Sequence, residues 1–168
     1  MGFEEEILIP KTRVAVLIGT KGSVRRDLER RTNVRLKISS DGIVTMKGKD
    51  ALEVMTAKTI VEAIGRGFNP VIAKELLKED YSFVLIHLED YRGKGSTLDR
   101  IRGVLIGRAG KARRVVEEET GARISILGKT VAIIGPADCA LKAKQAVEMF
   151  LTGARHATVY KFLGRRDD

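Results

Sequence analysis

The sequence contains one stretch twice, and this repeat restricts the folds that the chain can adopt. The first copy reads Val-Leu-Ile-Gly-Thr-Lys-Gly at residues 16–22, and the second reads Val-Leu-Ile-Gly-Arg-Ala-Gly at residues 104–110. Aligning residues 16–38 on residues 104–126 without gaps gives 11 identities in 23 positions. The similarity continues to Gly67 and Gly153. A unit of about 65–70 residues is too long for a solenoid repeat and suits a small domain that folds alone.

Hydrophobic periodicity predicts the same order of elements in both units. In the first unit we expect a strand over 6–10, a helix over 13–18, a loop over 19–22, a helix over 23–31, strands over 34–39 and 43–47, and a helix over 50–64. In the second unit we expect a strand over 81–88, a helix over 98–106, a loop over 107–110, a helix over 111–120, strands over 123–127 and 130–134, and a helix over 136–151. The fold class is therefore α+β, with three strands and three helices in each unit.

Two further expectations concern the core and the domain boundaries. The long helix of the first unit is expected to bury Leu52, Met55, Ile60, Val61 and Ile64. The dipeptide Asn69-Pro70 indicates a boundary, which gives a first domain over 1–69, a connecting helix or linker over 70–79 and a second domain over 80–168. The last stretch, 152–168, is apolar enough to pack on one of the units.

Positive charge is concentrated around the repeated loops. The net charge is +9, while residues 11–37 carry nine Lys or Arg against two acids and residues 92–123 carry nine against four. These two stretches therefore hold +7 and +5, and the remainder of the chain is −3. A charge that served only solubility would be spread over the surface, so this distribution favours a polyanionic partner.

Several classes of function lack the residues that they need. There is no apolar run long enough to cross a membrane, and the acidic N-terminus does not resemble a signal peptide, so we expect a cytoplasmic protein. One cysteine and two histidines make a disulfide or a zinc site implausible. No spaced carboxylates and no Ser/His/Asp or Cys/His grouping occur. We expect no catalytic residue, no metal, no cofactor and no enzymatic activity.

The repeated Gly-x-x-Gly loops have the chemistry of a phosphate contact. A glycine has no Cβ, so a sugar-phosphate backbone can approach the main chain, and the following helix presents its positive N-terminus. The middle positions carry Lys21 and Arg108. The predicted backbone contacts are Gly19, Thr20, Lys21, Gly22, Arg25 and Arg26 in the first unit, and Gly107, Arg108, Ala109, Gly110, Lys111, Arg113 and Arg114 in the second.

Apolar residues beside each loop are predicted to form the floor of a groove for unstacked bases. These are Ile18, Leu36 and Ile38 in the first unit, and Ile106, Ile124 and Ile126 in the second. Two plainer interpretations stay open at this point. The glycines can be ordinary turn residues, and the arginines can form a solvated helix face that pairs with Glu29 and with Glu117–Glu119.

The loop, the basic helix that follows it and the order of elements resemble the KH domain of type I, βααββα. The resemblance implies two tandem type I KH domains, each a three-stranded sheet packed by three helices. In that family the loop clamps about four backbone nucleotides of a single RNA strand. Aromatic residues are only 5% of the chain and tryptophan is absent, which disfavours the stacking platform of an RRM.

The second unit allows a narrower comparison. Residues 101–111, 128–135 and 153–163 resemble the archaeal KH family of small-subunit ribosome assembly factors, whose eukaryotic relatives are called partner of Nob-one. The resemblance implies single-stranded RNA binding near the 3′ end of small-subunit rRNA, in subunit assembly and pre-rRNA 3′-end processing. It also implies the maturation endonuclease and the rRNA dimethyltransferase as partners. We expect a monomer.

Two hypotheses from other classes remain. One is a protein-interaction scaffold in ribosome assembly or translation, in which one KH unit binds a protein partner. The other is an RNA-processing enzyme, which the residues support least. Replacing Gly107 and Gly110 by aspartate is expected to leave the fold intact and to abolish RNA binding at the second loop if that loop is the main site.

Overall fold

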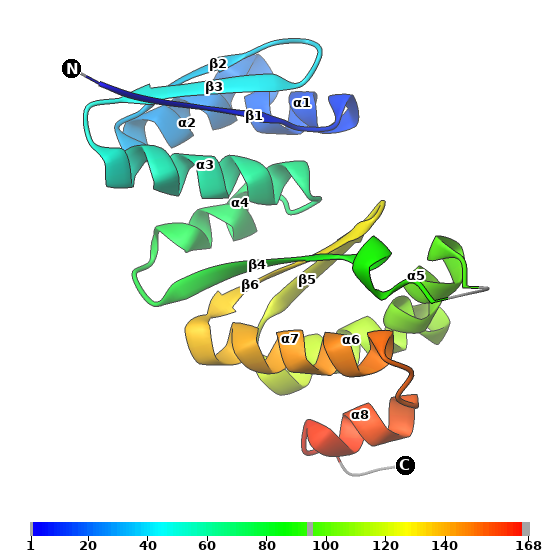
Figure 1. Cartoon of the computed structure of the whole chain (residues 1–168). Helices are drawn as coiled ribbons and strands as arrows, with labels where there is room; N and C mark the ends of the chain where they lie inside the picture. Colours follow the sequence, from blue (N-terminus) through cyan, green and yellow to red (C-terminus); the bar gives the residue numbers. More distant parts are fainter. Residues whose placement is uncertain (1, 94–95, 166–168) are drawn as a thin grey trace. The chain divides into compact units, whose positions relative to one another are not determined.

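The structure is a computed structural model that describes residues 2–93 and 96–165 (Figure 1). The chain divides into two compact units, residues 1–79 and 80–168. Each unit contains a three-stranded antiparallel sheet, and the predicted order of strand, helix, helix, strand, strand and helix is present in both. The α+β class and the tandem type I topology are therefore confirmed.

The first unit begins with a strand, and a pair of short helices follows it. Its strands are β1 (Phe3–Leu8), β2 (Arg35–Ile38) and β3 (Ile43–Gly48), in the sheet order β1-β3-β2. Its helices are α1 (Lys11–Ile18), the 3-10 turn η1 (Thr20–Gly22), α2 (Ser23–Thr32), α3 (Ala51–Gly65), α4 (Pro70–Ala73) and η2 (Lys74–Leu77). Asp50 caps α3 by accepting from the Leu52 amide at 2.9 Å.

The second unit repeats this arrangement. Its strands are β4 (Tyr81–His87), β5 (Arg123–Leu127) and β6 (Thr130–Pro136), in the sheet order β4-β6-β5. Its helices are η3 (Leu88–Tyr91), α5 (Leu98–Ile106), η4 (Arg108–Gly110), α6 (Lys111–Thr120), α7 (Ala137–Leu151) and α8 (His156–Phe162). The central strand β6 is buried along most of its length, as expected for the middle of a sheet that packs on helices.

The core of the first unit corrects one expectation about α3. Leu52 and Met55 are 77% and 48% exposed, and the buried apolar residues of the helix are Val54, Ala57, Ile60, Val61 and Ile64. Nine residues separate Leu52 from Val61, and at 3.6 residues per turn this places the two side chains on opposite sides of the helix. The buried residues recur every three or four positions along α3 and include Ala57. The prediction omitted Ala57 because it considered only the large apolar residues.

A further helical segment follows the last core helix in each unit. In the first unit, Ala73 is fully buried and the Lys74 ammonium lies 2.7 Å from the Asp27 carboxylate on α2. In the second unit, Val159 on α8 and Leu163, the residue after it, are buried. The prediction that the C-terminal stretch packs on a unit is confirmed for the described residues through Arg165, whose guanidinium lies 3.2 Å from Glu118 on α6.

Candidate nucleic-acid interface

The two Gly-x-x-Gly loops have the same backbone conformation. Gly19 and Gly107 both have φ 76° and ψ 172°. The third residue of each loop is left-handed, with φ 53° and ψ 31° at Lys21 and φ 53° and ψ 30° at Ala109. Non-glycine residues adopt this left-handed conformation rarely, because it costs conformational free energy, and both copies of the loop bear that cost. The repeat therefore preserves one particular turn and not merely a flexible connection.

The first glycine of each loop is required by the fold itself. A Cβ on Gly19 would lie 2.5 Å from Cγ2 of Val24, and a Cβ on Gly107 would lie 2.6 Å from the amide nitrogen of Ala112. Since neither position has room for a side chain, the loop turns back directly onto the next helix. The expectation that Gly107 tolerates aspartate with the fold intact is therefore wrong.

The second glycine of each loop has a different environment. A Cβ on Gly22 would lie 2.9 Å from the Arg26 guanidinium and 3.9 Å from that of Arg25, and a Cβ on Gly110 would lie 3.8 Å from the Arg114 guanidinium. These contacts are with the ends of flexible side chains. The surface above the second glycine is therefore the place where another molecule can approach the loop backbone closely.

Both helices that follow the loops begin without a capping side chain. The N-cap residues of α2 and α6 are Gly22 and Gly110, and neither helix carries an acidic residue in its first turn. In contrast, a side-chain oxygen of Asp50 and of Thr97 caps α3 and α5. A helix N-terminus has unpaired N–H groups and a partial positive charge. At α2 and α6 the first amides, those of Ser23 and Lys111, donate to the carbonyls of Thr20 and Arg108 in the preceding turns. No acidic side chain offsets the partial positive charge of either helix in its first turn, which favours an anion there.

A second arginine in each copy braces the loop. The Arg26 guanidinium donates to the carbonyl of Lys21 at 2.6 Å, and the Arg114 guanidinium donates to the carbonyl of Ala109 at 3.1 Å. Both side chains remain exposed. Each guanidinium has five N–H donors, so four are left for a phosphate beside the loop.

The preceding arginine in each copy, Arg25 or Arg113, forms an ion pair within its own helix. Arg25 lies 3.2 Å from Glu29, and Arg113 lies 3.0 Å from Glu117. The ion-paired interpretation therefore holds for Arg25 and Arg113. The backbone contacts predicted for these two arginines must compete with those carboxylates.

The same two glutamates bridge helix and sheet, which the sequence reasoning missed. The second carboxylate oxygen of Glu29 accepts from the Leu36 amide at 2.9 Å, and that of Glu117 accepts from the Ile124 amide at 2.8 Å. The amides belong to β2 and β5, which are edge strands. Glu29 and Glu117 are identical residues in the aligned repeat. That identity was the available signal.

Burial separates the six predicted groove residues into two groups. Ile106 is 37% exposed, and Ile18, Ile38 and Ile126 are half-buried beside the loops. Leu36 and Ile124 are 3% and 6% exposed and belong to the hydrophobic cores. Because side chains alternate along a strand, Leu36 faces the helices of its own unit. We correct the predicted floor accordingly and leave Leu36 and Ile124 out of it.

Both units of the chain match described KH families. Residues 82–168 match the family described as eukaryotic type KH-domain (KH-domain type I), and residues 4–63 match the KH domain. The chain belongs to the KH-domain family. A KH domain-containing protein of Methanocaldococcus jannaschii is 48% identical over 165 residues, which cover 96% of this chain and 73% of the relative.

Three solved structures have the same architecture as this chain. Dim2p from Pyrococcus horikoshii OT3 superimposes with a TM-score of 0.90 at 43% identity, over 98% of this chain and 99% of that one. The a/eIF2alpha–aDim2p–rRNA complex of the same organism gives 0.91 at 43% identity, over 99% and 94%. A protein of unknown function from Aeropyrum pernix gives 0.90 at 34% identity, over 97% and 89%.

The C-terminal helix lies beside the second KH loop. His156 on α8 bonds through Nε2 to the carbonyl of Val104 at 2.9 Å, one turn before the loop. The Lys111 ammonium, at the start of α6, lies 5.8 Å from the centre of the Tyr160 ring. This cation–π contact positions the exposed Lys111 near the loop. Sequence reasoning placed Lys111 in the interface but did not connect it with α8.

Other kinds of site find no support in the described part of the chain. Across residues 2–93 and 96–165, no three His, Cys, Asp or Glu side chains are grouped as a metal site. No helix there is long and apolar enough to span a bilayer. Burial, with a smaller contribution from Asp138, raises the pKa of the Cys139 thiol, which keeps it in its less reactive neutral form.

Proposed function

We propose that this KH protein binds single-stranded RNA in small ribosomal subunit assembly and pre-rRNA 3′-end processing, and that its two Gly-x-x-Gly loops hold the RNA backbone. The observation that carries the proposal is the pair of matching loops, each of which opens onto a glycine-capped, basic helix. The relative Dim2p has been crystallised with rRNA, which supports the same class of nucleic acid here. The proposed partner is the 3′ region of small-subunit rRNA.

The geometry suggests how one strand is held. A phosphate sits over Gly22 or Gly110, where the first-turn amides of α2 or α6 point outward. Lys21 or Arg108 contributes a cation from the loop, and Arg26 or Arg114 contributes its unused N–H groups. The unstacked bases then lie on the exposed Ile106 and on the half-buried isoleucines beside the loops, which are Ile18, Ile38 and Ile126.

The proposed role is that of an assembly factor without catalysis. It acts in the cytoplasm as a monomer and presents the RNA to enzymes that cut or modify it. The maturation endonuclease and the rRNA dimethyltransferase are the proposed protein partners. Purified protein incubated with labelled rRNA and Mg²⁺ is expected to leave the RNA intact, and specific cleavage would contradict this role.

The middle loop residues provide the test. The variants R108D/A109D and T20D/K21D place two carboxylates where phosphates are proposed to lie. Asp tolerates the left-handed conformation at positions 21 and 109, so both variants are expected to fold. We expect each to weaken single-stranded RNA binding by about tenfold or more, since one lost charged contact is worth about 1.5–3 kcal/mol.

The control variant K144E/Q145E makes the same change in charge on α7, away from the loops. It is expected to change RNA affinity by less than about threefold, because it acts only through the general field of the protein. Circular dichroism and thermal unfolding establish that all variants are folded. Wild-type affinity in both loop variants would contradict the proposal.

A second candidate function is a scaffold in which the first KH domain binds a protein. It is favoured by Leu52 and Met55, two large apolar side chains exposed on α3 of that domain. The relative aDim2p is present in a complex with a/eIF2alpha as well as rRNA. Under this alternative, T20D/K21D leaves RNA affinity unchanged, whereas R108D/A109D abolishes it.

A further inference from the structure

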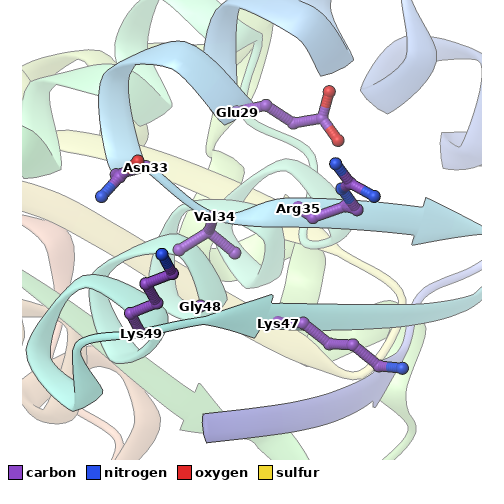
Figure 2. Close-up of a pocket in the computed structure, with 7 residues that line it drawn as sticks. All are labelled: Glu29, Asn33, Val34, Arg35, Lys47, Gly48 and Lys49. Carbon is purple, nitrogen blue, oxygen red and sulfur yellow. The ribbon is translucent and has the colours of Figure 1, made fainter. Parts of the chain in front are cut away.

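The first KH domain has a cationic hollow at the far end of β2 from its loop. The hollow measures about 450 Å³ and lies between the last turn of α2, the start of β2 and the end of β3 (Figure 2). Three of its lining side chains are cations, namely Arg35, Lys47 and Lys49. Lys37 lies two residues further along β2, on the same face as Arg35. We call these four residues the β2–β3 cation patch.

Positive charge in this patch is only partly neutralised. Arg35 and Lys47 are directly opposite each other on adjacent antiparallel strands, a pairing of like charges that destabilises a sheet. Glu4 lies 3.6 Å from Lys47. Among the described residues no carboxylate forms an ion pair with Arg35, Lys37 or Lys49, all of which are exposed.

The nearby carboxylates are already occupied. Glu29, which also lines the hollow, accepts from the Leu36 amide and pairs with Arg25 at 3.2 Å. Glu53 accepts a hydrogen bond from the Asn33 side chain at 3.3 Å. An anion that enters the hollow therefore meets Arg35 and Lys49, which form no ion pair among the described residues, while the acidic groups around it are held by other partners.

The second domain provides an internal comparison. Strand pairing places Arg123 opposite Ile134, where the first domain has Arg35 opposite Lys47. Two residues further along the chain, Pro136 stands where the first domain has Lys49. The hollow in the second domain is lined by Arg114, Glu117, Glu118 and Arg123, so its acids balance its cations. Of the four corresponding positions in the described part of the second domain, only Arg123 keeps a cation.

We infer that the β2–β3 cation patch binds the sugar-phosphate backbone of RNA that continues beyond the nucleotides held at the first loop. This inference rests on the proposed function. Ile38, in the proposed base groove, and Arg35 are the two ends of the edge strand β2, about 10 Å apart at 3.3 Å per residue, and their side chains point to opposite faces of the sheet. An RNA strand that leaves the groove and follows this edge therefore reaches the cations on the other face, and its regularly spaced phosphates are the occupant that this path favours over an acidic protein.

The test compares two RNA lengths in the full chain. The variant R35Q/K49Q is measured with an oligonucleotide of about four nucleotides, which fits one loop, and with a long fragment of small-subunit rRNA. Two lost phosphate contacts reduce the slope of log K against log salt by about 1.4, at about 0.7 each. The long fragment is expected to bind about tenfold more weakly at physiological salt, and the short one unchanged.

The variant K144Q/K161Q removes the same number of charges elsewhere and serves as the matched control. It is expected to match wild type on both RNAs. The inference is overturned if R35Q/K49Q binds the long fragment like this control, or if it loses the short and the long RNA equally. It is also overturned if a poly-glutamate peptide binds wild type as tightly as the long RNA and R35Q/K49Q does not bind it.

If the proposed function itself is wrong, the loop variants give a different result. In that case R108D/A109D and T20D/K21D leave binding of the short oligonucleotide unchanged, whatever R35Q/K49Q does to the long fragment. Replacing Arg35 also relieves the like-charge pair with Lys47, so R35Q/K49Q is expected to unfold at a temperature no lower than that of wild type.

Discussion

At the scale of single residues, the two glycines of each loop have separate tasks. The first glycine is in a conformation that is nearly restricted to glycine, and its missing Cβ leaves room for the next helix. The second glycine leaves room for a partner outside the protein. A search for functional glycines that treats both alike would therefore confuse a requirement of folding with a requirement of binding.

This separation predicts unequal costs for one added methyl group. G107A is expected to destabilise the second domain by about 3 kcal/mol or more, because a rare backbone conformation and a collision with Ala112 add together. G110A is expected to cost about 1 kcal/mol, the cost of a left-handed alanine alone. Urea unfolding of the two variants measures the difference, and equal losses would contradict this account of the loop.

The motif and its charge indicated where the cations of the loops lie, but not the contacts that depend on the fold. Lys21, Arg108 and Lys111 are exposed at the loops, and their binding of RNA stays a prediction. Arg26 and Arg114 bond backward to loop carbonyls, which no spacing rule indicated. Leu36 and Ile124 were misplaced because an apolar residue on a strand fits a core and a groove floor equally well until the facing helices are known.

At the scale of elements, the bridge from helix to edge strand is the least expected feature. An edge strand has unpaired N–H groups that are open to other chains, and Glu29 and Glu117 satisfy one such group in each domain. The bridge also sets the distance between the basic helix and the strand that bounds the base groove. The glutamate thus has a structural reason to be the same in both copies.

Removing one glutamate tests the bridge. E117A is expected to destabilise the protein by about 1.5–3 kcal/mol, because it breaks a charge-assisted hydrogen bond to the Ile124 amide. The neighbouring change E118A removes an exposed contact with Arg165 and is expected to cost about 0.5 kcal/mol or less. Thermal unfolding compares them, and an E117A variant as stable as E118A would exclude the bridge.

A second contact between elements predicts a dependence on pH. The hydrogen bond from Lys74, with help from Arg31, holds the pKa of Asp27 below its usual range. The folded state thus binds fewer protons at this group, so its stabilising contribution is complete above about pH 3.9 and is lost as the pH falls through the lowered pKa. D27N is expected to be less stable than wild type at pH 7 and equally stable below the folded pKa. A difference in stability between D27N and wild type that is the same at all pH values would contradict this account of Asp27.

Element boundaries were predictable to the extent that the repeat and the apolar periodicity specified them. Asp50 caps α3 as expected, and the hairpin glycines lie between the predicted strands. The buried face of α3 was predicted wrongly because Leu52 and Met55 are large apolar residues, whereas the residue that packs in the core is the small Ala57. The relation between η2 and α2 could not be predicted in this way, because it depends on the contact between Lys74 and Asp27, which are 47 residues apart.

At the scale of the whole molecule, positive charge is divided between two loops in one chain. Each loop should make its own phosphate contacts, and each lost contact lowers the salt slope by about 0.7. R108D/A109D is therefore expected to bind single-stranded RNA with a shallower dependence on salt than wild type does. Titrations at several salt concentrations measure it, and a slope equal to that of wild type would mean that the second loop touches no phosphate.

The most direct measurement is of the backbone amides themselves. Nuclear magnetic resonance of the full chain, titrated with single-stranded rRNA, reports the amide shifts of residues 20–24 and 108–112. The account predicts that the largest shifts occur in these two segments, because phosphates lie on the starts of α2 and α6. Saturable RNA binding that leaves both segments unshifted would contradict it.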